Sequence, residues 1–280
     1  MFDKDKDFLY LCNTIKRNIM TKALFFDIDG TLVSFQTHVI PASTIEALTL
    51  AHEKGIQIFI ATGRPTLIIN NLGELQSRGL IDGYITMNGG YCYVGNEIIY
   101  KSCIAKEDVQ TMARISQERN YACIFVGEHE AWVCQPNDEL RQIFYNFLGV
   151  KEFPEVSLKE AISHDIYQLT PFFTAEEELE IVPQMPNSEF GRWYHSFVDI
   201  TAKGNTKQNG IDQFIKRFGF KLEETMAFGD GGNDIGMLRH AGIGIAMGNA
   251  KDDVKAAADY VTDSVDEDGI FKALKHFNVI

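Results

Sequence analysis

The sequence predicts a doubly wound, Rossmann-like α/β core with a parallel sheet, interrupted by one inserted α+β cap domain. Two observations predict the core. Short apolar strands alternate with helical segments toward both ends of the chain, and polar motifs follow directly where these strands end. A third observation predicts the insertion, because the middle of the chain changes to hairpins mixed with helices. A chain of 280 residues is long enough for one or two such domains.

The first part of the core has the alternation of a parallel sheet. Residues 23–26 and 56–61 are short apolar runs that predict buried strands, and residues 84–87 predict a third. Residues 41–54 and 65–75 are predicted to form the helices between them. Strand, helix, strand, helix, strand is the order expected of a parallel sheet with crossover helices.

The middle of the chain has a different pattern. Gly95-Asn96 is a two-residue hairpin signal between strand-like residues 91–94 and 97–100. The further segments of the middle part are predicted helices at 106–119, 137–148 and 176–182 and predicted strands at 121–126, 131–134, 166–170, 189–194 and 197–201. We therefore expect an α+β cap domain with an antiparallel sheet at residues 89–195.

The alternation resumes after the cap. The predicted elements are helices at 207–218, 233–240, 252–258 and 268–277 and strands at 226–228, 242–246 and 260–261. The expected core is therefore residues 20–88 together with residues 196–280. Residues 1–19 carry no motif, and Met20 lies just before the first strand, so we expect an N-terminal extension outside the fold. A short amphipathic helix docked on the surface is the alternative for this segment.

Composition excludes several classes of function. The formal net charge of −13 disfavours nucleic acid or an anionic membrane as a partner. The five cysteines form no C-x-x-C pair, and their odd number argues against a secreted disulfide framework. No apolar stretch approaches the roughly 20 residues that span a bilayer. We expect a cytoplasmic protein, with a monomer favoured, that acts on a small molecule.

The most informative motif is Asp27-Ile28-Asp29-Gly30-Thr31, directly after the first strand. Ligands of open α/β sheets bind just outside the carboxyl ends of the strands. Two carboxylates one residue apart are costly at such a place unless a cation neutralises them. Asp27 is the expected nucleophile, and Asp29 can face the same pocket as a general acid and base. A surface Asp-Gly turn is the alternative.

Two further motifs follow other predicted strands. Thr62 and Gly63 lie where a strand turns into a helix, and hydroxyl and N–H groups there form an anion site. A plain helix cap is the alternative for Thr62. Asp230 follows the strand at 226–228 and would reach the same crevice as Asp27.

Four carboxylates cannot crowd together without a hard cation, and oxygen ligands point to Mg²⁺. The predicted metal-site residues are Asp27, Asp29, Asp230 and Asp234.

These segments resemble the four signature motifs of the haloacid dehalogenase superfamily of phosphotransferases, and most closely its Cof-type sugar phosphatase branch, subfamily IIB. The resemblance runs from about Met20 to the C-terminus. The four matching segments are Asp27 to Thr31, Ile60 to Arg64, Gly204 to Lys207 and Gly229 to Asp234. The resemblance implies Mg²⁺-dependent hydrolysis of a small phosphate monoester, such as a sugar phosphate, through an aspartyl-phosphate intermediate.

The resemblance also implies roles for single residues. It assigns Asp27, the backbone carbonyl of Asp29, and Asp230 as direct metal ligands, and Asp234 as a residue that holds waters or orients Lys207. Lys207 would neutralise the phosphate and the nucleophile. An Asp at the second position of the first motif is typical of the phosphatases, whereas the ATP-driven pumps of the superfamily carry Thr there.

Three neighbouring residues of these motifs have weaker expectations. Asn233 is expected either to contact phosphate or to cap its helix. Arg64 and Lys203 are expected to be solvated.

The cap lies between Thr62 and Lys207, which in the superfamily is the place of the large α/β cap. Such a lid would exclude water and contact the rest of the substrate. Trp193 would stack on a sugar face and Arg192 would meet a second anionic group, or both would be part of the cap core. Two alternative functions stay open: a phosphohexomutase resembling phosphomannomutases, and a non-catalytic metabolite sensor. The intact catalytic motifs argue against the sensor.

Overall fold

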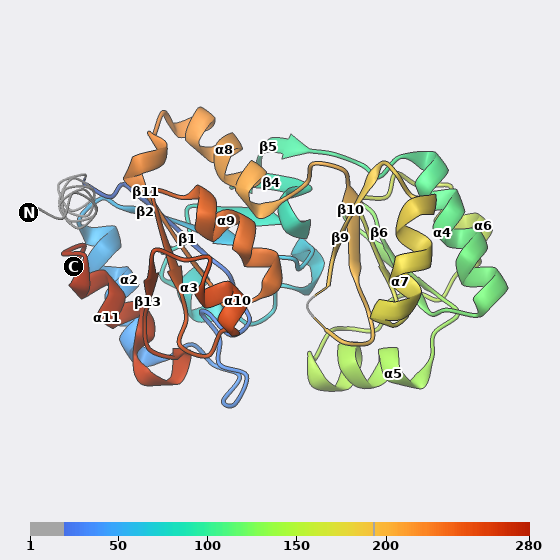
Figure 1. The fold of residues 1–280 in the computed structure, drawn as a ribbon, viewed down its shortest axis with the longest axis horizontal. Helices are drawn as coiled ribbons and strands as arrows, with labels where there is room; N and C mark the ends of the chain where they lie inside the picture. Colours follow the sequence, from blue (N-terminus) through green and yellow to red (C-terminus); the bar gives the residue numbers. More distant parts are fainter. Residues whose placement is uncertain (1–19, 193) are drawn as a thin grey trace, which may run out of the picture. The chain divides into compact units, whose positions relative to one another are not determined.

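The computed structural model describes residues 20–192 and 194–280, whose strands form two sheets (Figure 1). The eight-stranded sheet has the order β13-β12-β11-β1-β2-β3-β4-β5. Strand β1 pairs in parallel with β2 and β11, and β11, β12 and β13 continue in parallel. The bounds are β1 Ala23–Phe26, β2 Gln57–Ala61, β3 Gly83–Thr86, β4 Tyr91–Val94, β5 Glu97–Lys101, β11 Thr225–Gly229, β12 Ile243–Ala246 and β13 Tyr260–Val261.

The second sheet has five strands in the order β7-β6-β8-β10-β9, and each neighbouring pair is antiparallel. The bounds are β6 Cys123–Val126, β7 Ala131–Cys134, β8 Gln168–Pro171, β9 Ser188–Gly191 and β10 Asp199–Ala202. Together the two sheets confirm the predicted fold class, a doubly wound core with an additional α+β part.

Helices connect most of the strands. The α-helices are α2 Ala42–Glu53, α3 Gly73–Ser77, α4 Lys106–Arg119, α5 Asp138–Leu140, α6 Leu158–Ala161, α7 Ala175–Ile181, α8 Lys207–Phe218, α9 Ile235–His240, α10 Asp252–Lys255 and α11 Gly269–His276. The shorter turns are 3₁₀ segments at η1 Thr66–Ile68, η2 Met87–Gly89, η4 Val182–Gln184, η5 Leu222–Glu224, η6 Gly232–Asp234 and η7 Val265–Glu267, and a π-helical turn at η3 Arg141–Phe147. Figure 1 shows α2 and α11, from opposite ends of the sequence, side by side.

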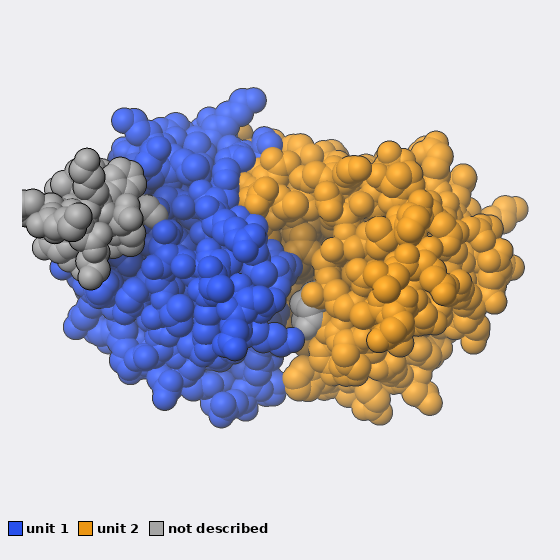
Figure 2. Space-filling model, viewed as in Figure 1, with its two compact units in different colours: residues 1–60, 74–84, 211–280 blue, residues 61–73, 85–210 orange. Residues whose placement is uncertain are grey.

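The chain divides by its contacts into two compact units (Figure 2). Of the described residues, the first contains 20–60, 74–84 and 211–280, and the second contains 61–73, 85–192 and 194–210. We expected domain boundaries at residues 88 and 195. These boundaries rest on the change of strand pattern in the sequence and not on contacts, and they stay a prediction.

The core of the first unit explains why β1 is apolar at every position. Phe25 stacks on Phe59 of β2 with ring centroids 5.1 Å apart, and Phe214 of α8 packs edge-on against both rings. On the opposite face, Phe26 stacks on Phe228 of β11 at 4.6 Å. A parallel strand covered on both faces needs bulky apolar residues throughout, and all four residues of β1 are fully buried.

The second unit is likewise built on two packed faces of its sheet. One face presents Phe125 and Leu169 to a cluster that includes Met112 of α4. The other face presents Ile124 to a cluster that includes Phe197. Alternate residues of β6 thus enter different cores, as the two-residue period of a strand requires.

Two local predictions were wrong. The predicted hairpin β4–β5 forms, but it extends the eight-stranded sheet instead of joining the five-stranded antiparallel sheet. A hairpin signal is local and does not determine which sheet the hairpin joins.

The predicted helix at residues 65–75 is the other error, because it is interrupted between η1 and α3. Ile69 has an extended backbone, and the Asn70 side chain donates to the carbonyls of Leu148 and Gly149 at 3.1 and 3.2 Å.

Two expectations concern the N-terminal segment and the membrane. Residues 1–19, expected to be an extension, lie outside the described residues. None of the helices that the described residues form has the length and apolar character that a membrane crossing requires.

Candidate active site

The strand order places two of the predicted aspartates next to each other in the first unit. From β1 the chain continues through β2 and β3 on one side, whereas β11, β12 and β13 lie on the other side, so the strand order reverses between β1 and β11. Asp27 directly follows β1 and Asp230 directly follows β11, and the Asp27 N–H donates to the Phe228 carbonyl at 3.0 Å. Such a reversal at the carboxyl ends of parallel strands is the usual ligand-binding place of this architecture.

Three carboxylates converge at this place. Oxygen atoms of Asp27, Asp230 and Asp234 lie within 4.8 Å of one another. Asp27 is only 7% exposed and Asp234 is fully buried. Buried like charges at this separation repel unless a cation or protons neutralise them. An all-oxygen, carboxylate-rich donor set fits a hard divalent cation, so these residues could hold a metal ion.

Asp234 organises the loop that carries Asp230. Its Oδ2 accepts the backbone N–H groups of Asp230 at 3.0 Å and of Gly231 at 2.8 Å, within the turn that leads into η6 and α9. One carboxylate oxygen of Asp234 is therefore engaged by the backbone. The expected role of Asp234, to hold waters or to orient Lys207, stays a prediction.

The loop after β1 closes on Asp230. Gly30 has a φ of +85°, and a Cβ atom at this position would collide with the Asp230 carboxylate. The Thr31 hydroxyl donates to Asp230 Oδ1 at 3.0 Å. Gly30 therefore lets the loop after β1 approach Asp230 closely, and Thr31 bonds to the Asp230 carboxylate. Asp29 is half-buried, and its side chain does not belong to the cluster of three carboxylates.

Asn249 is a residue of this site that the sequence analysis missed. Its Nδ2 donates to the Gly30 carbonyl at 2.8 Å and to Asp230 Oδ2 at 3.3 Å. Its Oδ1 accepts the N–H of Val265 at 3.0 Å. The signal in the sequence was its position, because Asn249 follows closely on β12, the strand next to β11.

In the second unit, the turn after β2 is built on Thr62. The Thr62 hydroxyl accepts the N–H of Arg64 at 3.0 Å, and its carbonyl accepts the N–H of Asn88 at 3.0 Å. Arg64 is 6% exposed, and its guanidinium donates to the Ile68 carbonyl at 2.9 Å. Our expectation that Arg64 is solvated was therefore wrong. The buried guanidinium bonds to the last residue of η1, and Arg64 thereby stabilises the turn that contains Thr62 and Gly63.

The third motif fixes Lys207 at the start of α8. Thr206 caps this helix, because its hydroxyl accepts the N–H of Asn209 at 3.2 Å. Asn205 is buried, and its side chain bonds to the Tyr100 hydroxyl at 3.2 Å and the Ser102 carbonyl at 3.4 Å. Lys207 is 1% exposed, and a lysine is almost never this buried unless it is paired. Lys203, by contrast, is exposed as expected.

Arg192 is engaged within the second unit. Its Nε pairs with Glu178 at 2.7 Å, and its Nη1 donates to the carbonyls of His195 and Phe197 at 3.0 Å. The guanidinium also lies over the ring of Phe173. These contacts favour the structural alternative that we set beside a substrate role, and the substrate role stays a prediction. Trp193 lies outside the described residues.

A first prediction concerns Arg192. Arg192→Ala should lower the melting temperature by several degrees, since it breaks a half-buried ion pair and several charged hydrogen bonds worth roughly 2–3 kcal/mol in total. Arg192→Lys should recover only part of this loss, because an ammonium cannot reproduce the planar fork.

The matched control is Arg114→Ala, which removes an exposed pair with Glu118 within α4. This change should cost less than about 0.5 kcal/mol. An unchanged melting temperature for Arg192→Ala, combined with a selective loss of activity on large phosphate esters, would instead support substrate contact.

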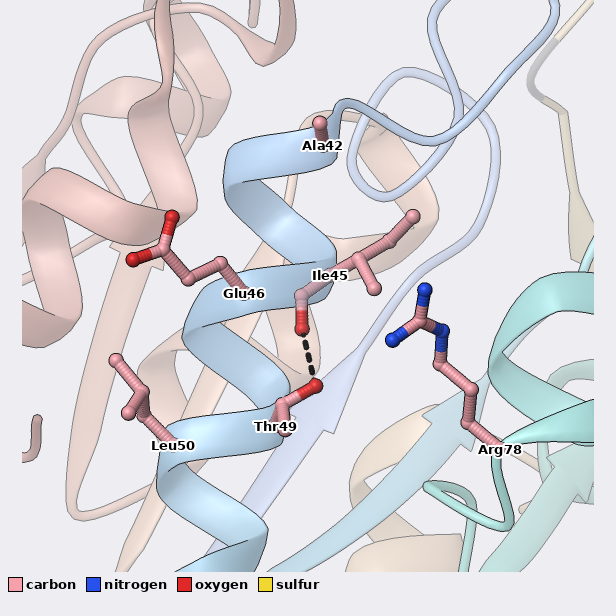
Figure 3. A pocket seen from close by; sticks show the side chains of 6 residues that line it. All are labelled: Ala42, Ile45, Glu46, Thr49, Leu50 and Arg78. Atoms are coloured by element: carbon pink, nitrogen blue, oxygen red, sulfur yellow. Dashed lines mark hydrogen bonds between the residues drawn. The ribbon is translucent and has the colours of Figure 1, made fainter.

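A surface pocket on α2 is separate from these residues. It is lined by Ala42, Ile45, Glu46, Thr49, Leu50 and Arg78 (Figure 3). The Thr49 hydroxyl donates back to the Ile45 carbonyl, and Arg78 pairs with Glu74. No residue of the predicted motifs lines this pocket, and its ionic groups do not converge as in the carboxylate cluster. We therefore place the candidate active site at the strand ends.

The chain is similar to known proteins over most of its length. A family model of haloacid dehalogenase-like hydrolases matches residues 24–274. A solved structure described as a subclass IIB sugar phosphatase of this superfamily is 65% identical, with a TM-score of 0.91, and the match covers 93% of this chain and all of that one. YkrA of Bacillus subtilis is 32% identical over 263 residues, which are 93% of this chain and 99% of YkrA. The pyridoxal phosphate phosphatase YbhA of Escherichia coli is 30% identical over 272 residues, which are 88% of this chain and 96% of YbhA.

Proposed function

Because this chain belongs to the haloacid dehalogenase-like hydrolases and is a phosphatase, we propose that it hydrolyses sugar phosphates and similar small phosphate monoesters through an aspartyl-phosphate on Asp27, with Mg²⁺ as its metal. The observation that carries this proposal is the convergence of Asp27, Asp230 and Asp234 at the carboxyl ends of β1 and β11. Three carboxylate groups at a ligand-binding strand edge suit a Mg²⁺ ion that also binds phosphate.

The substrate class is supported by the relative with the higher identity. The structure that is 65% identical over its whole length is a sugar phosphatase, whereas YbhA, at 30% identity, is a pyridoxal phosphate phosphatase. We therefore place a sugar phosphate first and other compact phosphate monoesters second.

Asp27 would supply the nucleophile. A carboxylate oxygen of Asp27 attacks phosphorus, and the bond from phosphorus to the leaving oxygen breaks, which leaves an acyl phosphate on Asp27. Asp29 donates a proton to the leaving oxygen in this step. It then removes a proton from the water that attacks phosphorus in the second step, which releases inorganic phosphate and restores the Asp27 carboxylate.

Mg²⁺, bound by Asp27, the backbone carbonyl of Asp29, and Asp230, would neutralise negative charge on the carboxylates and the phosphate. Asp234 would support this site through the loop of Asp230, whose N–H it accepts.

Four residues would bind the phosphate oxygens. We assign this role to Lys207 as a cation, to Thr62 and Gly63 as hydroxyl and N–H donors, and to Asn233 as an amide donor. The support is chemical, since Lys207 is a buried cation at the first position of a helix, and Thr62 and Gly63 form a turn directly after β2.

The test is phosphate release from a panel of phosphorylated sugars and other metabolites. Hexose phosphate should give equal amounts of free hexose and inorganic phosphate without added sugar bisphosphate, because water completes the second step. EDTA should abolish turnover, and added Mg²⁺ should restore it.

Other products would favour the alternatives. Isomerised hexose phosphate that appears only with added bisphosphate would support the phosphohexomutase. Tight binding of a phosphorylated metabolite without turnover of any ester would support the sensor.

A further inference from the structure

The Asn249 side chain connects three loops of the first unit. It bonds to Gly30 in the loop after β1, to Asp230 in the loop after β11 and to Val265 at the start of η7. Asn249 itself is exposed to solvent, yet both its amide nitrogen and its amide oxygen are engaged. An exposed surface amide ordinarily bonds to water, whereas both polar atoms of the Asn249 amide bond to protein groups.

The orientation of the amide follows from the network. The partner of Oδ1 is the N–H of Val265, which can only donate, whereas the partners of Nδ2 are a carbonyl and a carboxylate, which accept. In the opposite orientation, the amide oxygen would face the Gly30 carbonyl and the Asp230 carboxylate, which are both acceptors. The amide nitrogen would then face the N–H of Val265, which is a donor. The amide nitrogen therefore faces the loops of Asp27 and Asp230.

The backbone around Asn249 is held in place independently. The N–H of Ala250 donates to the Met247 carbonyl at 3.0 Å, which closes a tight turn directly after β12. The N–H of Gly248 donates to the Asp263 carbonyl at 3.0 Å, and a Cβ atom at Gly248 would lie 2.6 Å from the Ser264 nitrogen. The turn is thus fixed against a second loop, and it presents Asn249 from a fixed position.

The consequence for Asp230 is that both its carboxylate oxygens accept a bond from a neighbouring side chain. Thr31 donates to Oδ1 at 3.0 Å, and Asn249 donates to Oδ2 at 3.3 Å. Two donors on opposite oxygens restrict rotation of the carboxylate, and Asn249 also holds the Gly30 carbonyl of the loop that carries Asp27. Groups that orient a metal-binding carboxylate in this way typically change metal affinity when they are removed.

We infer that Asn249 is a positioning residue that orients Asp230 and fixes the loop of Asp27, so that the carboxylate cluster binds a divalent cation. This inference rests on the proposed function, because it assigns Asn249 to the metal site of that reaction. In this role Asn249 acts through Asp230 and the loop of Asp27 and does not contact the substrate.

The test is the variant Asn249→Ala. Its affinity for Mn²⁺, used in place of Mg²⁺, is measured by electron paramagnetic resonance in the absence of substrate. The dissociation constant for Mn²⁺ should rise about 10- to 100-fold. The Mg²⁺ concentration for half-maximal phosphate release should rise similarly, while KM for the ester at saturating Mg²⁺ stays within about twofold, since Asn249 orients the metal ligand rather than the substrate.

Two further variants keep the result interpretable. Asn249→Leu keeps nearly the same side-chain volume, adds no charge and loses all three bonds, so it should also weaken Mn²⁺ binding even if Asn249→Ala fails to fold. Asn146→Ala removes an exposed amide in the second unit, bonded to Gln142, and should leave Mn²⁺ affinity unchanged.

The outcomes separate the two proposals. A folded Asn249 variant that binds Mn²⁺ as tightly as the unaltered protein overturns the positioning role and leaves the phosphatase mechanism standing. Weakened Mn²⁺ binding in a protein that releases no phosphate from any ester would support the positioning role and contradict the proposed reaction. An unaltered protein that binds no divalent cation overturns both.

Discussion

Asp27→Asn should abolish phosphate release while leaving the fold intact. The amide has the size of the carboxylate but is neither a nucleophile nor a good ligand for a hard cation, so the aspartyl-phosphate cannot form. Loss of a catalytic nucleophile typically lowers kcat by about 10⁴-fold or more. The melting temperature without metal should stay the same or rise, because the change removes one charge from three crowded carboxylates.

The covalent step can be measured directly. Rapid quenching of the unaltered protein with substrate labelled on its phosphate should give an acyl phosphate that is cleaved by hydroxylamine, and Asp27→Asn should give none. Asp253→Asn, at an exposed position of α10, is the matched control and should behave like the unaltered protein. Turnover by Asp27→Asn above about one-tenth of normal, or a label that persists in it, would rule out Asp27 as the nucleophile.

The sequence predicted the carboxylate cluster because its residues follow strands with unambiguous apolar runs. Ala23–Phe26 is short, bulky and buried on both faces, and its end is marked by Asp27. Asp230 follows β11 in the same way. Parallel strands that lie side by side bring the residues after their carboxyl ends to one edge, so the rule of strand ends was enough to group these two residues.

Asn249 was missed because its contribution depends on tertiary contacts. Gly248-Asn249 has the composition of an ordinary turn, since asparagine and glycine are the residues that turns favour, and only its position after β12 marks it. Its partners lie 219, 19 and 16 positions away in the chain. Only the neighbouring positions of β12 and β11 in the sheet bring its amide to Asp230.

Charged residues of the second unit were the hardest to predict. Arg64 was expected in solvent, yet its guanidinium is buried and bonds to the Ile68 carbonyl. Arg192 lies among several carbonyls and Glu178. The long side chain of arginine lets its guanidinium reach solvent, a backbone carbonyl or a substrate. The position of an arginine in the sequence does not show which of these it contacts.

Lys207→Met should lower kcat by about 10²- to 10³-fold, the usual effect of removing one group that stabilises charge in the transition state. Lys207 is 1% exposed at the first position of α8, so its cation cannot be replaced by water or by a mobile surface lysine. Methionine fills nearly the same volume with no charge, which keeps the packing loss small. Lys207→Arg should not restore activity, because the planar guanidinium is larger than the ammonium that this buried position holds.

The matched control for this change is Lys203→Met, four residues earlier in the chain, at an exposed lysine that donates to the Pro186 carbonyl at 3.2 Å. It removes the same charge from the same connection and should leave kcat within about twofold, since exposed charges contribute little. The decisive measurement is kcat and KM for one sugar phosphate in all three variants at saturating Mg²⁺, together with their melting curves. If Lys207 binds phosphate, Lys207→Met loses kcat, or kcat and affinity together, in a folded protein. If Lys207 is only a structural partner of buried acids, its loss should appear as a lowered melting temperature, with near-normal kcat in the fraction that remains folded.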